Sequence, residues 1–553
     1  MTRVVLAAEL QNGGLDSVAG VAAHWARCGI AVQRVGAIPD AVDGDVLVVW
    51  SDRTPDEATQ ERLVELARRG TPLLLLGPTL AAWRGAQAVL DAAGVLPGAL
   101  TQAHEIRLVA GRDGPGVATR MGGELCVSDR LLLLDKVADD VEQLLCASWR
   151  LADHAVATWR PESRVGTFNL AGDALDDPRV LRLLHRWLRH ALGLDDGPDV
   201  RVGILGYGAI GHEHSAAIAA VPGLHLTAVC DRNVGRLAEA RLLAPDVRTC
   251  DDAEQLVGAD DVDLVIVSTP PNTHASWVLR ALDAGQHVVV EKPFCLTVAE
   301  ADEMVALAAE RDRLLAVYQN RRWDADYLAL RDVVRSGAIG DVFHLESFVG
   351  GYGHPCSYWH SDAEVSGGAV YDWGSHHLDW TLDLIPQPVR WVSATTQKRV
   401  WHDVSNADHS RVTLGFADGA EAEFVHSDLA AALKPKWYVL GTRGAVRGDW
   451  RHESVLARDA VGNLVEDPLA AAESPATLTV CTPVAGGGVS EQRLAIPPAP
   501  AQPFHRELAD ALLGDEPMSI TAAGSRRNIA VMEAATRSAA EGGRPVELAD
   551  LGA

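Results

Sequence analysis

The residue types that could do chemistry gather in two short segments, Glu291-Lys292-Pro293 and Gly367–His376. Lys292 follows the run His287–Val290, which predicts a buried strand, and a lysine is rarely buried without a partner. Its ammonium could stabilise an oxygen that develops negative charge, or it could form a structural ion pair with Glu291. The spacing alone leaves both alternatives open.

Asp372 and His376 form the second candidate group. They are four residues apart, which predicts that they share one face of a helix. A histidine titrates near neutrality and could accept the proton of a hydroxyl, a role that contributes about 10²–10⁴-fold, while Asp372 would orient its ring. A surface ion pair or half of a metal site would show the same spacing, but no third ligand follows at a fitting distance, so we expect no metal. His377 is the rival base and faces another way.

A glycine-rich turn upstream predicts a dinucleotide site. The run Val200–Leu205 predicts a strand that leads directly into a GxGxxG segment and a helix. In this arrangement glycines allow a tight turn, backbone approach to a pyrophosphate and close helix packing, with the helix N-terminus facing the phosphates. The alternative is a glycine-rich surface turn. The predicted contacts are Gly206, Gly208, Ala209, Ile210 and Gly211.

The cofactor preference depends on the end of the next strand, Leu226–Cys230. Asp231 follows it, 25 positions after Gly206, where a carboxylate would bind ribose hydroxyls and repel a 2′-phosphate. The adjacent Arg232 could attract that phosphate, but Asp231 favours NAD over NADP. Further expected cofactor contacts follow the predicted strand Asp263–Ser268 or the predicted strand His287–Val290: Ser268, Thr269, Pro270, Asn272, His274, Glu291 and Lys292.

The elements that position these residues predict an α/β and α+β multidomain chain. Residues 1–195 alternate apolar strands and helices, as in a flavodoxin-like parallel sheet, and Leu194–Asp199 predicts a linker. Residues 199–322 predict a Rossmann domain, with further strands at His287–Val290 and Leu314–Tyr318. Residues 323–550 follow as a mainly antiparallel, open-faced sheet domain with two terminal helices.

Composition excludes several classes of partner. The net charge is −26, from 49 basic and 75 acidic residues, so the chain repels nucleic acids and anionic membranes. Eight scattered cysteines form no CxxC pair, and the chain runs directly into a predicted strand without a leader-like segment. We therefore expect a cytoplasmic protein that acts on a small molecule, as a homo-oligomer, either a dimer or a tetramer.

Residues 200–548 resemble the Gfo/Idh/MocA oxidoreductase family. The resemblance rests on ordered motifs: Gly206–Gly211, Ser268–His274, Glu291-Lys292-Pro293, Gly367–His376 and the closing Glu533-Ala534-Ala535. It implies that Lys292, Asp372 and His376 are catalytic in an NAD(P)-dependent dehydrogenase of a sugar, glycoside or cyclitol, with the oxidised hydroxyl possibly at C3.

Two alternative functions belong to the same resemblance. One is a glycosidase or lyase that retains NAD and acts by transient oxidation and elimination. The other is a non-catalytic NAD(P)-binding regulator, which the joint presence of Lys292, Asp372 and His376 disfavours. Candidate substrate contacts, which could equally be core residues, are Trp323, Tyr358, Trp359 and His377.

Residues 1–193 resemble the ThuA-like domain related to class I glutamine amidotransferases. The motif is Val156–Asp173 followed by Asp176-Asp177-Pro178-Arg179. Where many relatives carry Gly-His, this chain has Gly172-Asp173, and no cysteine nucleophile follows the strand Pro72–Leu76. We expect this domain to contribute assembly or substrate enclosure rather than a second reaction.

Overall fold

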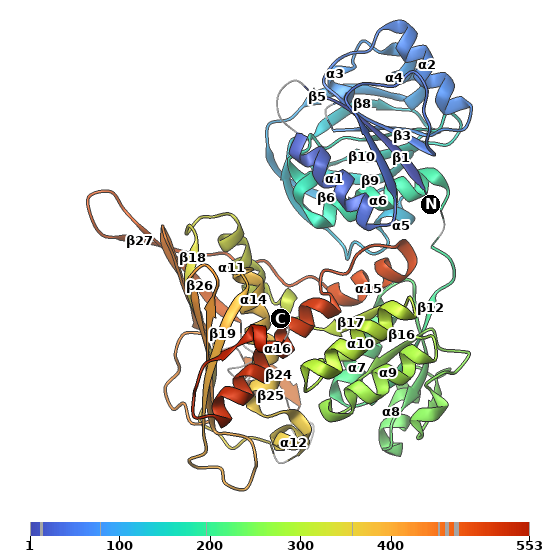
Figure 1. Cartoon of the computed structure of the whole chain (residues 1–553). Coiled ribbons are helices and arrows are strands. Elements are labelled where there is room, and N and C mark those ends of the chain that lie inside the picture. Colours follow the sequence, from blue (N-terminus) through green and yellow to red (C-terminus); the bar gives the residue numbers. More distant parts are fainter. Residues whose placement is uncertain are drawn as a thin grey trace. The chain divides into compact units, whose positions relative to one another are not determined.

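The computed structural model describes residues 2–10, 15–77, 79–194, 196–356, 358–451, 454–458, 464–468 and 475–551. The chain divides into two compact units (Figure 1), which we describe separately. The first unit comprises Met1–Val200, Ala217–Leu224 and His505–Met518, and the second comprises Arg201–Ala216, His225–Phe504 and Ser519–Ala553. Asp195, in the predicted linker, lies outside the described residues. Among the described helices, none combines the length and apolar character needed to cross a bilayer.

The second unit begins with a parallel Rossmann-type sheet in the strand order β14-β13-β12-β15-β16-β17. Its strands are β12 (Val200–Leu205), β13 (Leu224–Cys230), β14 (Arg248–Cys250), β15 (Leu264–Val267), β16 (His287–Glu291) and β17 (Leu315–Tyr318). Its helices are α7 (Ala209–Ala220), α8 (Val234–Leu243), α9 (His274–Asp283) and α10 (Val298–Glu310). The predicted strands are present within two residues of their expected ends, because each is a short apolar run buried on both faces.

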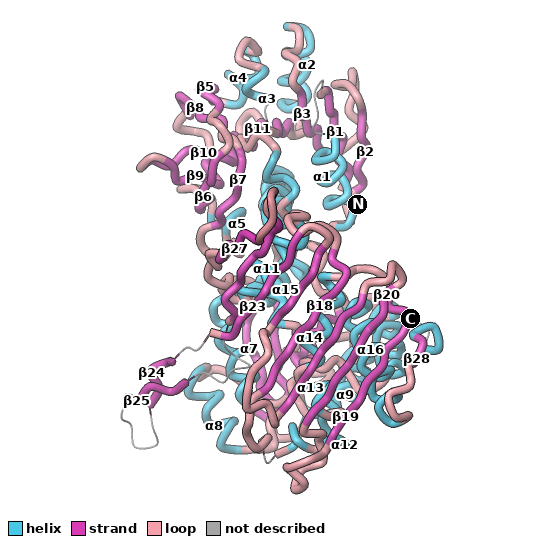
Figure 2. The backbone as a smooth tube through the Cα atoms, turned by 90° about the vertical axis from the view of Figure 1, so that its left-hand side faces the viewer, coloured by secondary structure: helices cyan, strands magenta, loops and turns pink. Residues whose placement is uncertain are grey.

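A second, larger sheet follows in the order β27-β26-β23-β22-β18-β21-β20-β19-β28, and Figure 2 shows its strands. They are β18 (Val342–Gly350), β19 (Val389–Gln397), β20 (His409–Phe416), β21 (Glu421–Ser427), β22 (Trp437–Gly441), β23 (Gly444–Trp450), β26 (Ala476–Pro483), β27 (Val489–Arg493) and β28 (Val546–Glu547). Strands β18 and β21 pair in parallel, and the other described pairs are antiparallel. A hairpin of β24 (Ser454–Arg458) and β25 (Leu464–Pro468) stands apart from it.

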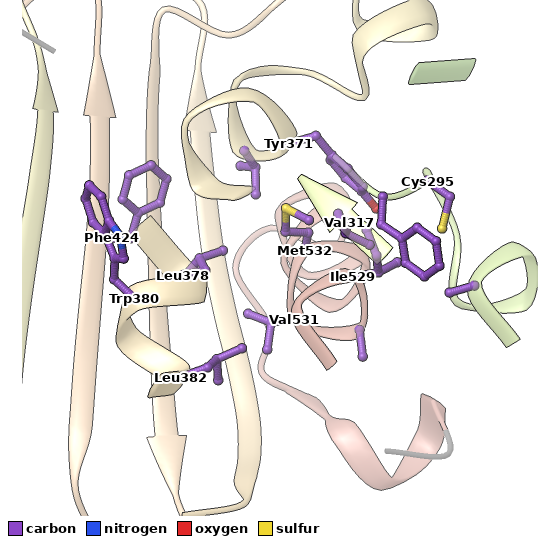
Figure 3. Packing of buried hydrophobic residues seen from close by; sticks show 14 of the residues in the cluster. Cys295, Val317, Tyr371, Leu378, Trp380, Leu382, Phe424, Ile529, Val531 and Met532 are labelled. Atoms are coloured by element: carbon purple, nitrogen blue, oxygen red, sulfur yellow. The ribbon is translucent and has the colours of Figure 1, made fainter. Parts of the chain in front are cut away.

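One continuous hydrophobic core joins the two sheets of this unit. The helices between them are α11 (Ala325–Arg335), α12 (Ala363–Ser366), α13 (Ala369–Asp372), α14 (Gly374–Leu384) and α16 (Ala522–Ala540). Figure 3 shows Ile529 and Met532 of α16 grouped with Val317 of β17 and Tyr371 of α13. Because burial of a large apolar side chain contributes about 1.5–3 kcal/mol, this helix fixes α13 and α14 against the end of the Rossmann sheet.

The first unit is built around a mixed sheet in the order β2-β1-β3-β4-β11-β10-β9-β6-β7. Its strands are β1 (Arg3–Glu9), β2 (Ala31–Val35), β3 (Val46–Ser51), β4 (Leu73–Leu76), β6 (His104–Ala110), β7 (Leu125–Asp129), β9 (Glu142–Trp149), β10 (Ala152–Arg160) and β11 (Val165–Phe168). Strands β1, β3 and β4 are neighbours that pair in parallel, in agreement with the parallel sheet predicted for this part of the chain. The antiparallel half from β10 to β7 was not predicted, and neither was the pair β5 (Val95–Leu100) and β8 (Leu132–Val137).

Helices cover both faces of this first sheet and enclose two apolar clusters. They are α1 (Leu15–Arg27), α2 (Glu57–Arg68), α3 (Thr79–Ala82), α4 (Gln87–Ala93), α5 (Pro115–Ala118) and α6 (Pro178–Leu192). Helix α15 (Pro503–Gly514) also lies here for most of its length, since residues His505–Met518 belong to this unit. The sequence analysis placed these residues in the third domain, because nothing local in their pattern reveals a distant docking site.

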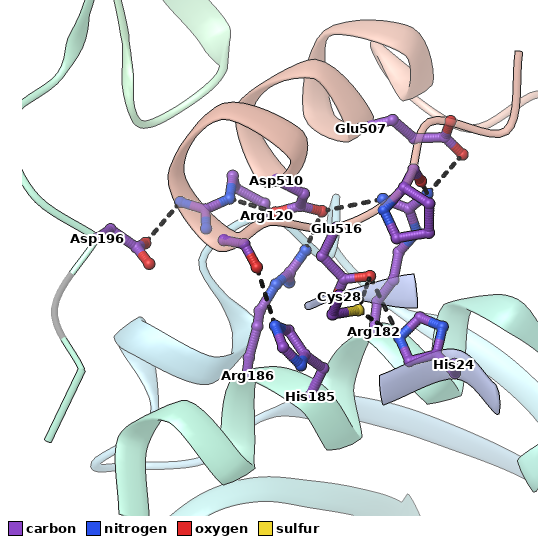
Figure 4. A network of polar contacts seen from close by, with 12 residues as sticks. His24, Cys28, Arg120, Arg182, His185, Arg186, Asp196, Glu507, Asp510 and Glu516 are labelled. Carbon is purple, nitrogen blue, oxygen red and sulfur yellow. Dashed lines mark hydrogen bonds and ion pairs between the residues drawn. The ribbon is translucent and has the colours of Figure 1, made fainter. Parts of the chain in front are cut away.

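Asp510 of α15 is the centre of a buried ionic network (Figure 4). It is 2% exposed and accepts hydrogen bonds from the guanidinium groups of Arg120 and Arg186. Arg120 also bonds Asp196 at 2.8 Å, and Arg182 lies 3.3 Å from Glu507. Removing one member of a buried charge network leaves its partners uncompensated, so these contacts bind α15 firmly to α6.

We expect Asp510→Asn to lower the free energy of unfolding of the first unit by about 3–5 kcal/mol, because two buried guanidinium groups lose their shared carboxylate. Urea denaturation followed by circular dichroism measures the change. Glu65→Gln is the control, because its pair with Arg69 is exposed and should contribute less than about 1 kcal/mol. Equal effects of the two substitutions would contradict the assignment.

Candidate active site

The residues predicted to bind a dinucleotide follow neighbouring parallel strands. Gly206 follows β12, Asp231 follows β13, Ser268 follows β15 and Lys292 follows β16. The order β13-β12-β15-β16 places these four loops along one carboxyl edge of the sheet. Ligands of open parallel sheets bind at this edge.

The glycine turn has the geometry that pyrophosphate binding requires. Gly206 has φ +93°, and a Cβ there would lie 2.5 Å from the carbonyl oxygen of Ser268. A Cβ on Gly211 would lie 2.8 Å from the carbonyl oxygen of Gly206, so close helix packing also depends on glycine. Gly208 has nothing within 4 Å of its Cβ position, which leaves the backbone open at the start of α7, before Ala209 and Ile210. These residues fit a bound dinucleotide.

Asp231 organises the turn from the neighbouring strand. Its side chain is 8% exposed and accepts hydrogen bonds from the backbone N–H groups of Tyr207 and Asn233, each at 2.7 Å. Arg236 lies 3.3 Å from the same carboxylate, and Arg232 is exposed beside it. The carboxylate therefore shapes the glycine turn, a role that the sequence analysis did not assign to it.

The loop after β15 offers polar groups at the same edge. The Ser268 hydroxyl is buried without a hydrogen-bond partner among the described residues, and Asn272 is exposed. His274 is buried, with its ring nitrogens 2.8 Å from the carbonyl oxygen of Thr269 and 2.9 Å from that of Pro293. Burial lowers the pKa of His274, so its neutral ring donates to one carbonyl at a time. His274 thus connects the loop after β15, which contains Thr269 and Pro270, to the loop after β16, which contains Pro293.

Lys292 finds its partner on the other side of the site. Its Nζ lies 2.8 Å from Oδ1 of Asp372, while Glu291 is bonded by Nε2 of His214 at 2.7 Å. The structural pair of Lys292 with Glu291, left open by the sequence, is therefore not formed. Burial alone would raise the pKa of Asp372, but the charge and hydrogen bond of Lys292 hold that pKa below its ordinary value.

Asp372 does not orient His376 as expected. Asp372 ends α13, Trp373 follows with helical dihedrals, and His376 lies in the first turn of α14. In the described part of the chain, Nδ1 of His376 is buried without a hydrogen-bond partner. Trp373, between the two residues, keeps helical dihedrals of φ −75° and ψ −33°, so the shared helical face stays a prediction, but no described contact joins Asp372 to the His376 ring.

The environments of His376 and His377 distinguish the two candidate bases. Burial, followed by the charges of Lys292 and Arg321, holds the pKa of His376 well below its ordinary value. His377 is 2% exposed and packs against Trp380 and Phe424, with ring centroids 4.8 and 5.1 Å away. His377 is thus a core residue, and its expected contact with a substrate finds no support in this position.

Two further histidines face the Lys292–Asp372 pair. His360 and His426 act electrostatically on Asp372, and the strong burial of His426 lowers its pKa to about 4. The sequence analysis missed both. A signal for His426 was present in the sequence of β21, because Ala422, Phe424 and His426 alternate toward one face of this strand.

The aromatic residues expected to contact substrate lie on two segments. Trp359 stacks on His360 with centroids 3.7 Å apart, and Tyr358 is 61% exposed beside them. Trp323 packs edge to face on Phe504 at 6.1 Å. Because His360 also faces Asp372, the Trp359–His360 stack is close to the candidate catalytic residues, whereas Trp323 is held by core packing.

Two family models match the second unit. Residues 200–319 match the oxidoreductase family with an NAD-binding Rossmann fold, and residues 327–447 match the GFO/IDH/MocA C-terminal domain. The uncharacterized oxidoreductase C115.03 of Schizosaccharomyces pombe is 31% identical over 258 residues, covering 45% of this chain and 70% of that protein. The chain belongs to the Gfo/Idh/MocA oxidoreductase family.

Two further proteins, one of them a solved structure, are matched by this chain over nearly their whole length. The scyllo-inositol 2-dehydrogenase (NADP+) IolW of Bacillus subtilis is 25% identical and matches 62% of this chain and 94% of its own. A crystal structure of an NAD-binding protein from Listeria innocua is 26% identical, with TM-score 0.53, and covers 63% of this chain and 97% of its own. This Gfo/Idh/MocA protein is therefore an oxidoreductase with an NAD(P)-binding Rossmann domain.

We expect Gly208→Ala to weaken NADH binding by about tenfold or more without lowering the melting temperature, because the added methyl meets no protein atom within 4 Å but blocks backbone approach to phosphate. Gly206→Ala should lower both the affinity for NADH and the melting temperature, because its Cβ would clash with the Ser268 carbonyl oxygen. Fluorescence titration and thermal unfolding measure the two effects. Unchanged NADH binding by Gly208→Ala would contradict the proposed pyrophosphate position.

Proposed function

We propose that this protein is an NAD-dependent dehydrogenase that oxidises a ring secondary alcohol of a sugar, glycoside or cyclitol, or runs the reverse reduction. The observation that carries the proposal is the 2.8 Å contact between Lys292 and Asp372, which places a fixed positive charge at the carboxyl edge of the Rossmann sheet beside His376. The similarity to a scyllo-inositol dehydrogenase supports a cyclitol-like substrate.

His376 is the proposed base for the hydroxyl proton. Its lowered pKa keeps the imidazole neutral at pH 7, so a ring nitrogen can accept a proton. Burial also makes the protonated ring costly, which favours rapid return of the proton when the reaction runs as a reduction. Phe424 and Trp380 hold the neighbouring His377 in the core, so only His376 of this pair is proposed to act on substrate.

Lys292 is proposed to donate a hydrogen bond to the reacting oxygen. Asp372 holds the ammonium at 2.8 Å, which leaves its other N–H groups free to point at a ligand. A positioned cation in a water-poor site stabilises alkoxide character strongly. The role of Asp372 is thus to hold Lys292, in place of the ring-orienting role expected from the sequence.

NAD, held by the glycine turn, Asp231 and the Ser268 loop, would supply the hydride acceptor. The chain's own residues favour NAD over NADP, because the Asp231 carboxylate lies at the end of β13 and would repel a 2′-phosphate. Arg232 and Arg236 oppose this preference, and the Bacillus subtilis relative is NADP-linked. The proposal therefore rests on Asp231 outweighing two exposed, water-screened guanidinium groups.

The first unit is proposed to be a ThuA-like domain that contributes assembly or substrate enclosure. Its parallel strands β1, β3 and β4 agree with a flavodoxin-like origin. No cysteine follows β4 where a nucleophile would stand in related enzymes. We further propose that the protein is a cytoplasmic homo-oligomer.

We expect His376→Ala to reduce turnover at least about 100-fold while NADH binding is retained, because the base is lost and the glycine turn is untouched. His377→Gln should keep most of the turnover. Steady-state rates of NADH formation on a panel of sugars and cyclitols provide the measurement. Near-normal turnover of His376→Ala with an inactive, folded His377→Gln would show that the base assignment is wrong by one residue.

The pH profile offers a second readout of the same base. Because the pKa of His376 is lowered, its neutral form persists below pH 6.5, so kcat/KM for oxidation should stay level through pH 6.5 and fall only at more acid pH. An acid limb centred above pH 6.5 would contradict the buried, neutral base.

For the cofactor, we expect Asp231→Ser to narrow the preference for NAD by about 1–3 kcal/mol, because it removes both the ribose acceptor and the repulsive charge. Titrating wild-type and variant protein with NADH and NADPH measures the change, and Arg232→Ser, which should widen the preference, is the matched control. Tighter binding of NADPH than NADH by the wild-type chain would overturn the assignment.

A further inference from the structure

A second group of reactive side chains lies in the first unit, outside the proposed dehydrogenase site. The group consists of His24, Cys28 and Glu516 (Figure 4). The side chains of His24 and Glu516 are 5% and 1% exposed, and Cys28 as a whole residue is 4% exposed. Their imidazole, thiol and carboxylate atoms all lie within 4.8 Å of one another. No local pattern connects the three residues, because Cys28 and Glu516 are 488 positions apart.

Two independent elements bring the three side chains together. His24 in the last turn of α1 and Cys28 just beyond it are four residues apart, and the Cys28 N–H bonds the His24 carbonyl at 3.1 Å, so they share one face. Glu516 follows α15, which the Asp510 network fixes against α6. The arrangement is thus held by contacts that do not involve the three groups themselves.

The distances fit tetrahedral coordination. Nε2 of His24 lies 3.2 Å from Oε2 of Glu516, and Sγ of Cys28 lies 3.7 Å from Nε2 of His24 and 4.0 Å from Oε2 of Glu516. Zinc bonds of about 2.0–2.1 Å to nitrogen and oxygen and 2.3 Å to sulfur, at tetrahedral angles, separate N from O by about 3.3 Å and S from either by about 3.6 Å. Each observed distance is within about 0.5 Å of these values.

The same pocket holds buried acceptors that lack a donor. Within the described ranges, Oε1 of Glu516 and Nδ1 of His185 are buried without a hydrogen-bond partner. Nε2 of His185 lies 2.9 Å from the Gly514 carbonyl, so in the neutral ring this nitrogen carries the proton and Nδ1 is an acceptor. The rings of His185 and His24 meet edge to face at 6.1 Å. Buried acceptors without a donor are compatible with a site that takes up a cation.

We propose that His24, Cys28 and Glu516 bind one zinc ion. A thiolate and a carboxylate neutralise the charge of Zn²⁺, so the buried site carries no net charge. The ion would bind α1 to the segment that follows α15, which gives it a structural role.

The competing arrangement is a purely protein network. In that case the Cys28 thiol stays protonated, since burial, followed by the Glu516 charge, raises its pKa to about 12. Arg182, which bonds the Pro517 carbonyl at 3.0 Å and lies 3.3 Å from Glu507, would then also have to satisfy Glu516. The two arrangements differ in one measurable property, because only the first releases a proton from Cys28 in exchange for a metal.

The test begins with the full chain, freed of metal by a chelator, and then dialysed against Zn²⁺. We expect elemental analysis to find about one zinc per chain, and a melting temperature several degrees above that of the metal-free protein, because zinc binds the folded state only. Substitution with Co²⁺ should give a thiolate-to-cobalt absorption band, since sulfur is a ligand. These measurements need no variant.

Variants identify the ligands. Cys28→Ser and Glu516→Gln should each lower zinc affinity by at least about tenfold, and Cys28→Ser should abolish the cobalt band. Cys146→Ser, which alters a buried cysteine on β9 of the same unit, is the matched control and should keep both zinc and the band. A folded wild-type chain that retains no zinc after dialysis, or a cobalt band that survives Cys28→Ser, would overturn the proposal.

Discussion

The ion pair between Lys292 and Asp372 is the contact on which the rest of the site depends. Lys292 belongs to the end of a parallel strand, and Asp372 to a short helix that leads into the second sheet domain, so their 2.8 Å contact joins the cofactor half of the site to the substrate half. The pair is only partly exposed, with side-chain fractions of 22% and 29%. Helix α16 makes this geometry possible, because Ile529 and Met532 belong to the continuous core that includes both halves.

The positive charge of Lys292, which is proposed to stabilise the reacting oxygen, also affects the pKa values of Asp372 and His376. Burial, and then the charge of Lys292, lower the pKa of His376, while Lys292 outweighs burial at Asp372 and lowers that pKa too, so the carboxylate is ionised and the imidazole neutral. These are the protonation states that hydride removal from an alcohol requires: a fixed cation, its counterion and an unprotonated base. Family membership and local electrostatics therefore support the same chemistry from separate observations.

Much of the second unit could be predicted from the sequence, since its strands are short apolar runs and its glycine turn is a local pattern. The contact between Asp372 and Lys292 could not be derived from local patterns, because the two residues are 80 positions apart in the sequence. The docking of residues 505–518 on the first unit was also beyond local reasoning. It depends on Asp510 meeting Arg120 and Arg186, which lie more than three hundred positions away in sequence.

The measurement that tests the central claim most directly is the fate of the carbinol hydrogen. Cyclitols, sugars and glycosides deuterated at their ring carbinol positions would be incubated with the full chain and NAD, and the reduced cofactor analysed by mass spectrometry. The account predicts that deuterium from one class of ring alcohol appears in NADH. A chain that binds NAD but transfers no deuterium to it from any of these compounds would contradict the assignment of Lys292, Asp372 and His376 to the oxidation of a ring alcohol.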